Sequence, residues 1–278
     1  MKRYFKSLSA ILVLLFILLP SGCQKKQKNP IAQKTQTAQK PQLPKELKKI
    51  EQDIDSIIKE TQKMQNMPPQ QAQKEKEKNE KGKEKEGKKT SKEGQNEKQE
   101  EKQAPQEKSW NTISQTVKDI HTNWNALNPI AVKAGAKPNL IDNMSTAINN
   151  LTISVEEKSL NDIMIKSNNV YKYIPDLEDM FKTLIPPDLK RLKYYNRNIL
   201  FNTYTDDWDT MSKDIINLNA IWKSLKPKLP KEAKHASDKF EAGLTELEKA
   251  VKSKNKTIAK VKSEILEIDI KSLESTIK

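Results

Sequence analysis

Residues 110–129 read WNTISQTVKDIHTNWNALNP, and residues 208–227 read WDTMSKDIINLNAIWKSLKP. The second stretch repeats the first at an offset of 98 residues with six identities, which include both tryptophans and the terminal Leu-x-Pro. Apolar residues recur every three or four positions in both stretches, which is the spacing of one face of an α-helix. The two stretches contain all four tryptophans of the chain, and they predict a duplicated helical domain rather than a solenoid of short repeats.

A second repeated block follows at an offset of 96 residues. Its apolar positions match in kind between the copies, with Met144, Ile148, Leu151 and Val155 in the first and Phe240, Leu244, Leu247 and Val251 in the second. The dipeptide Lys166-Ser167 likewise recurs as Lys262-Ser263. The offset changes by two residues near Gly135, where the first copy has a predicted turn, and insertions collect in turns.

Each copy is predicted to form three helices. The first copy is expected to have helices at about 110–127, 139–155 and 159–181. Ser109 is the expected cap of the first helix, Pro129 lies just past its end, and the third helix should kink or restart at Pro175. The second copy is expected to have helices at about 206–225, 232–252 and 255–276, preceded by a bridging helix between Pro186 and Tyr204. The predicted class is all-α, with duplicated three-helix units that form packed antiparallel bundles.

This plan resembles that of spectrin-like three-helix repeats, which also place tryptophan in the helical core. Apolar neighbours at helical spacing favour the same core role for the tryptophans of this chain. A groove that binds a ligand or carbohydrate is the alternative interpretation of the tryptophan stripe.

The chain between Gln24 and Lys108 is rich in Lys, Glu, Gln, Asn and Pro, and residues 74–89 contain no apolar side chain. Such a segment cannot bury enough surface to offset its ordering entropy, so we expect a disordered spacer that spans roughly 50 Å as a coil. One apolar seam interrupts it and predicts a short amphipathic helix at about 44–66, formed by Leu47, Ile50, Ile54, Ile57, Thr61 and Met64. This helix is expected to dock on the folded part or to associate with a second copy of itself, and binding to a lipid surface is the less favoured alternative because its apolar face is narrow.

The first residues of the chain have the layout of an export signal. Lys2, Arg3 and Lys6 precede an apolar run that ends in Leu19-Pro20-Ser21-Gly22-Cys23. The end of this run resembles the lipobox of bacterial lipoproteins, although Pro20 stands where leucine is usual. The resemblance implies a signal peptide at 1–22, a membrane anchor such as palmitate on Cys23, and a location on the extracytoplasmic face of a Gram-positive cell membrane.

The predicted organisation continues with the lipidated Cys23 and spacer at 23–108, helical repeat 1 at 109–185 and helical repeat 2 at 186–278. Residues 24–108 contain 22 basic and 15 acidic side chains, which account for +7 of the net charge of +14. A nucleic-acid-binding domain would carry its basic excess on the folded surface, so we expect no nucleic-acid partner. The lysine-rich spacer is instead expected to attract anionic lipid or wall polymer.

The sequence contains no pattern that predicts catalysis, a cofactor or a metal. His121 and His235 have no partner at a spacing such as His-Glu-x-x-His, and Asn219 replaces His121 in the second copy. The acidic clusters at 176–179 and 206–209 are interpreted as helix starts, where carboxylates complement the helix dipole, with a Ca²⁺ site as the alternative.

The best patch for a partner lies in the bridge between the copies and consists of Arg191, Tyr194, Tyr195 and Arg197. Tyrosine and arginine are frequent anchors at protein interfaces. The sequence therefore predicts a lipid-anchored, extracytoplasmic helical module that binds an envelope partner. The alternative is a structural spacing or assembly protein of the cell envelope, and an enzyme is the least favoured class because no nucleophile or acid–base pair stands out.

Overall fold

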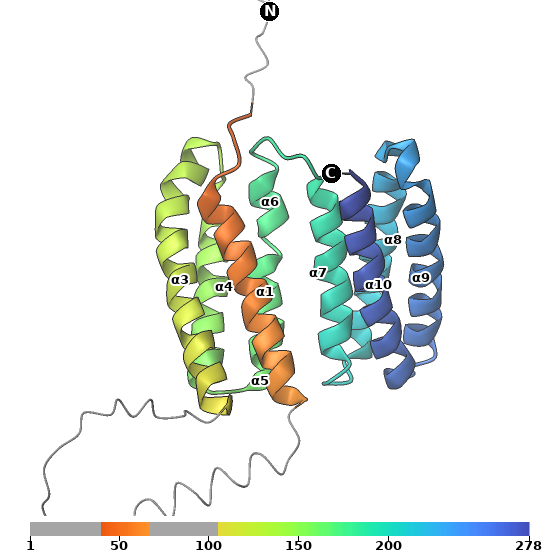
Figure 1. The fold of residues 1–278 in the computed structure, drawn as a ribbon, viewed down its shortest axis with the longest axis horizontal. Helices are drawn as coiled ribbons and strands as arrows, with labels where there is room; N and C mark the ends of the chain where they lie inside the picture. Colours follow the sequence, from red (N-terminus) through yellow and green to blue (C-terminus); the bar gives the residue numbers. More distant parts are fainter. Residues whose placement is uncertain (1–39, 67–104, 278) are drawn as a thin grey trace, which may run out of the picture. The chain divides into compact units, whose positions relative to one another are not determined.

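The computed structural model describes residues 40–66 and 105–277, and these residues form a set of packed helices (Figure 1). The all-α class and the packed helical bundles are confirmed. The predicted signal peptide, the lipid site at Cys23 and the predicted disorder of 67–104 lie outside the described residues. The helices are α1 (Lys45–Gln65), α3 (Pro105–Lys133), α4 (Pro138–Glu156), α5 (Leu160–Tyr171), α6 (Ile174–Glu178), α7 (Pro187–Asn202), α8 (Trp208–Leu225), α9 (Lys234–Lys252) and α10 (Lys256–Ile277).

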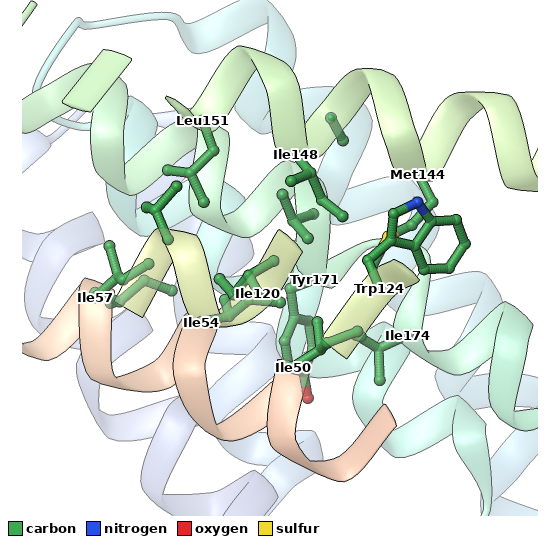
Figure 2. Close-up of a cluster of buried hydrophobic side chains, with 14 of the residues drawn as sticks. Ile50, Ile54, Ile57, Ile120, Trp124, Met144, Ile148, Leu151, Tyr171 and Ile174 are labelled. Atoms are coloured by element: carbon green, nitrogen blue, oxygen red, sulfur yellow. The ribbon is translucent and has the colours of Figure 1, made fainter. Parts of the chain in front are cut away.

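Helix α1 is an integral part of the folded region. Its apolar seam packs against α3 and α5, and Figure 2 shows Ile50, Ile54 and Ile57 pointing into the same cluster as Trp124 of α3. Each of these isoleucines exposes no more than 1% of its surface. Full burial of three isoleucines stabilises the docked helix by several kcal/mol. The first unit is therefore built on four long helices, α1, α3, α4 and α5, and the short α6 adds Ile174 and Leu177 to its core.

Helix α7 is the counterpart of α1 in the second unit. Residues 44–61 align with residues 186–203 at an offset of 142, with identities at the positions of Pro44, Leu47, Lys48, Ile57 and Thr61. Helix α7 packs against α8 and α10 as α1 packs against α3 and α5. The duplicated unit is thus a four-helix bundle, and each predicted three-helix copy gains one further helix at its start.

The position of α1 changes the role of the segments that flank it. The chain between Cys23 and the folded region is residues 24–44 rather than the whole of 24–108. In the sequence, residues 67–104 lie between α1 and α3, and these two helices pack against each other. Residues 67–104 connect two helices of one unit, whereas the second unit joins α7 to α8 through residues 203–207.

The first helix of repeat 1 is longer than its sequence predicts. Helix α3 continues through Pro129 to Lys133, because Ala131 is fully buried beyond the proline, and it ends near Gly135, which has a φ of +101°. Ser109 lies inside α3 and does not cap it, since its hydroxyl donates to Glu60 of α1 over 3.1 Å. The restart predicted at Pro175 is observed, because α5 ends at Tyr171 and α6 begins at Ile174.

The turns and cores confirm the duplication. Lys158, between α4 and α5, and Lys254, between α9 and α10, are 96 residues apart and have φ values of 53° and 51°. Trp124 and Trp222 each expose 4% of their surface. Trp110 and Trp208 are half-buried at the matching positions of α3 and α8. The same backbone and burial pattern is thus built twice from largely different residues.

Candidate functional site

The seam between α1 and α7 carries opposite charges at duplicated positions. Glu51 and Asp55 on α1 correspond, at the offset of 142, to Lys193 and Arg197 on α7. Asp55 accepts hydrogen bonds from Lys193 Nζ over 3.0 Å and from Arg197 Nη1 over 2.7 Å. Burial opposes the charge of Asp55, but Arg197 and Lys193 outweigh it and lower the pKa of this carboxyl. The first helices of the two units are therefore linked by charges that differ in sign between the copies.

A second ion cluster lies nearer the start of both helices. Lys190 Nζ donates to Glu51 over 2.6 Å and to Glu178, at the end of α6, over 2.5 Å. The Glu178 side chain is 3% exposed, against 20% for Glu51. Burial raises the pKa of Glu178, although the nearby Lys190 partly offsets this effect. Burial also disfavours the charged form of Lys190, but the attraction of the two carboxylates is stronger and raises the pKa of Lys190. One cation shared between two carboxylates leaves the more buried one less well compensated.

Tyr171 of α5 lies against this charged layer and is fully buried. Lys193 Nζ and Arg197 Cζ lie 5.1 and 5.2 Å from the centroid of its ring, within the range of cation–π attraction. Its hydroxyl donates to Glu51 over 3.2 Å. Burial raises the pKa of Tyr171 well above its ordinary value, so the phenol stays protonated and joins α5 to α1.

Arg197 extends the layer to α10. Its Nε and Nη2 atoms donate to Glu267 over 3.2 and 3.0 Å, while Nη1 contacts Asp55. Burial disfavours the charge of Arg197, but Glu267 and Asp55 outweigh it and raise the pKa further. Removing one partner of a buried pair leaves an uncompensated charge, which typically costs about 3–5 kcal/mol. The charged layer thus connects α1, α5, α7 and α10, which belong to both units.

The four residues predicted as a partner patch lie on α7 and mostly contact the chain itself. Arg197 and Tyr194 are buried, and the half-buried ring of Tyr195 lies 4.8 Å from that of Tyr194. Arg191 keeps 24% of its side chain exposed. Arg191 is also paired with three carboxylates of the chain, those of Asp176, Asp179 and Asp188. The burial of these patch residues could have been predicted from the apolar residues that recur along α7, which are Leu189, Leu192, Ile199 and Leu200.

Two clefts open along the contact between α1 and α7. One lies toward the start of these helices and the other toward their end. The first has a volume of about 450 Å³ and includes Leu184, which is 86% exposed. The loop that carries Leu184 is fixed to the chain before α1, because Lys182 N donates to Pro41 O over 2.8 Å. The second cleft, of about 470 Å³, lies between α1, α7 and α10 and is lined by apolar and charged groups such as Phe201 and Lys260. Clefts of this size and mixed lining can accommodate a small molecule or the side chains of a partner.

The histidines do not form a site with other ligands. His121 Nε2 lies 2.9 Å from the hydroxyl of Thr152, and His235 is exposed. Among the described residues, no group of three or more His, Cys, Asp or Glu side chains is arranged to hold a metal ion.

The two acidic clusters have structural partners in the described chain. Asp176 and Asp179 each accept a hydrogen bond from Arg191 Nη2 over 2.6 Å. Asp207 caps α8 by accepting from Thr210 N over 3.0 Å. Hydrogen bonds from the Thr210 side chain and backbone lower the pKa of Asp207. The interpretation of the second cluster as a helix start is therefore confirmed, and the first cluster anchors α6 to α7.

Comparison of the chain with protein-family models, curated proteins and solved structures gives no match. Of the helices in 40–66 and 105–277, none has an apolar stretch long enough to cross a membrane.

Proposed function

We propose that this protein is a lipid-anchored, extracytoplasmic helical interaction module, held at the membrane through Cys23. The observation that carries the proposal is the short path from the lipobox-like site to the folded region. Residues 24–44, which number 21, separate Cys23 from the first residue of α1. Even fully extended, they reach at most about 75 Å. A folded module attached in this way stays close to the membrane surface.

The docking of α1 supports this role mechanically. An anchor at Cys23 holds the chain upstream of α1, so α1 transmits any pull from the membrane to the bundle. Its apolar seam is buried against α3 and α5, and Glu51 and Asp55 tie it to α7. The apolar face that favoured self-association of residues 44–66 is thus occupied by the chain's own helices.

We place contact with an envelope partner at the two clefts along the seam between α1 and α7. They combine apolar side chains with charged groups, as binding sites do. The buried charges beside them are paired with one another. The lysine excess of residues 24–108 adds a second contact, with anionic lipid or wall polymer, whose strength should fall as salt is added.

Replacement of the lipid site tests the anchoring. In cells labelled with a palmitate analogue, the full chain should carry label, fractionate with membranes and be digested by protease added outside. Cys23→Ala should lose the label and be either unprocessed or released. Ser9→Ala, in the same leader, is the control and should behave as the parent. A Cys23→Ala protein that is processed and retained like the parent would show that the proposal is wrong.

A further inference from the structure

Helix α10 carries an apolar stripe that the described chain leaves uncovered. Ile258, Val261, Ile265 and Ile268 follow one another at spacings of three, four and three residues, so they lie on one face of the helix. They are between 44% and 64% exposed. The face of α10 that packs in the bundle is a different one, formed by Ala259, Ser263, Leu266, Ile270 and Leu273, all fully buried.

The first copy shows that the fold does not require an apolar stripe at these positions. At the offset of 96 residues, the four positions correspond to Asp162, Ile165, Asn169 and Lys172 of the first unit. Three of these four residues are polar, although α5 and α10 occupy equivalent places. The stripe is therefore a feature of α10 itself and suits contact with something outside the bundle.

The charged residues that flank the stripe would form opposite-charge pairs if two copies of α10 packed antiparallel. Lys262 and Asp269 lie along one side of it, and Glu264 and Lys271 lie along the other. In an antiparallel pair of α10 helices centred between Leu266 and Glu267, Lys262 faces Asp269 of the second copy. In the same register, Glu264 faces Lys271 of the second copy, so each pair occurs twice. Such flanking pairs set the orientation and register of packed helices.

The opposite orientation is disfavoured by the same residues. In a parallel pair with matched stripes, Glu264 of one copy would face Asp269 of the other, which places like charges together. Within one chain, Lys262 lies 3.6 Å from Glu246 and Lys271 lies 3.9 Å from Glu267. These long contacts leave both ammonium groups free to reach a second carboxylate.

We propose that this stripe is a self-association surface, on which α10 packs antiparallel against α10 of a second copy of the chain. In this register Ile265 of one copy lies opposite Ile268 of the other at the centre of the contact, and Ile258 and Val261 lie opposite Ser275 and Ser272. The surface is separate from the seam between α1 and α7, and the proposal does not depend on lipidation of Cys23.

Cysteine substitutions in the full chain test both the contact and its direction. With the axis between Leu266 and Glu267, the two copies of Ile268 are about 4.5 Å apart along the helix, whereas the two copies of Ile258 are about 25 Å apart. A short bismaleimide should therefore link Ile268→Cys into a covalent dimer and leave Ile258→Cys monomeric. The parent, with Cys23 alone, is the control. Equal dimer yields at both positions would overturn the antiparallel register, and dimers at neither position, or adducts to a different protein, would overturn the proposal.

Charge reversal gives an independent measurement in the purified full chain. Glu264→Lys should weaken the dimer about tenfold, because two attractive pairs become repulsive. The double variant Glu264→Lys/Lys271→Glu should restore the parent affinity in sedimentation experiments. Ile265→Asp should give monomers, while Ile216→Asp, at a 68% exposed position on α8, should leave the association unchanged. Failure of the double variant to recover, with its helical content intact, would contradict the assigned pairing.

Discussion

The two four-helix units share one plan but connect their first helices differently. In the second unit α7 leads into α8 through residues 203–207, whereas in the first residues 67–104 separate α1 from α3. The entropic cost of closing a loop rises only slowly with its length, so a long connection does not prevent α1 from docking. Membership of a helix in a unit is decided by its buried face, not by the length of the chain that joins it to the next helix.

The tryptophans at matching positions show what the duplication has kept and what it has changed. Trp124 Nε1 donates to Ser145 over 2.9 Å, while the buried Nε1 of Trp222 has no hydrogen-bond partner in the structure. The ring of Trp222 instead lies 4.5 Å from that of Phe240, at the position that Met144 occupies in the first unit. Burial of a large side chain has been kept, and the polar partner has not.

The largest expected effect is loss of either buried tryptophan. Trp124→Ala and Trp222→Ala should each lower the free energy of unfolding by about 3–5 kcal/mol, because both side chains are 4% exposed. Thermal and denaturant melts of the full chain measure the change. Trp208→Ala, at a half-buried position, is the matched control and should cost less. Parent-like melts for both buried positions would favour the groove interpretation instead.

A smaller effect concerns an acid that only the second unit buries. Burial raises the pKa of Asp214 to about 6, although a hydrogen bond of 2.6 Å from Asn198 lowers it. Its counterpart in the first unit, Thr116, is half-buried, and its hydroxyl donates to Thr112 O over 2.8 Å. Because the folded-state pKa exceeds the ordinary value of 3.8, the folded state binds the proton more tightly, and stability falls as pH rises from about 4 to 6.

Asp214→Asn should therefore raise the free energy of unfolding by about 2 kcal/mol at pH 7 and should lose this advantage below about pH 4. Denaturant melts at a series of pH values provide the measurement. Thr116→Asn, on the first unit, is the control and should give no such pH dependence. A gain that is the same at pH 4 and pH 7 would show that proton binding at Asp214 is not its cause.

The tryptophan hydrogen bond should be visible in a conservative substitution. Trp124→Phe loses the bond to Ser145, whereas Trp222→Phe removes an indole N–H that has no partner. The first change should cost about 1 kcal/mol more than the second, since both lose a similar apolar area. Paired denaturant melts measure this difference. A larger cost for Trp222→Phe would mean that the contact with Phe240 outweighs the hydrogen bond.

The smallest effect tests the shared turn. Lys158 and Lys254 adopt left-handed backbone angles that glycine tolerates better. Lys158→Gly and Lys254→Gly should each stabilise the protein by about 0.5–1 kcal/mol, net of the entropy that glycine loses. The gain at Lys158 should be slightly the smaller, because its ammonium group also lies 5.7 Å from the centroid of the Trp110 ring. A gain at one position and a loss at the other would show that the turns are not equivalent in solution.

Much of the fold could be predicted because Trp124 and Trp222 mark the same helix in both copies. The bridging helix and the restart at Pro175 also followed from apolar spacing and proline. The relation between α1 and α7 was hidden, because its offset is 142 rather than 98 residues. The extension of α3 past Pro129 depends on the tertiary burial of Ala131, which no local pattern reports.

The charged layer was harder to predict for a different physical reason. Asp55 and Arg197 occupy the same position in the two copies with opposite charges, so a comparison that seeks similar residues does not pair them. Their contact depends on how the two units face each other, and hydrophobic periodicity carries no information about that. A search for sign reversal at duplicated positions would have singled out Glu51 and Lys193 as well.

The central claim is that α1 belongs to the folded unit although long segments flank it. Residues 67–104 contain 11 lysines, so brief treatment with trypsin should cut there. If α1 is the first helix of the unit, the fragment that contains it should coelute with the fragment that begins near residue 105 on native size exclusion. The same digestion of Ile54→Asp, which places a charge in the buried seam, should separate the two fragments. Separation of the two fragments of the parent protein, with both still helical, would contradict the account.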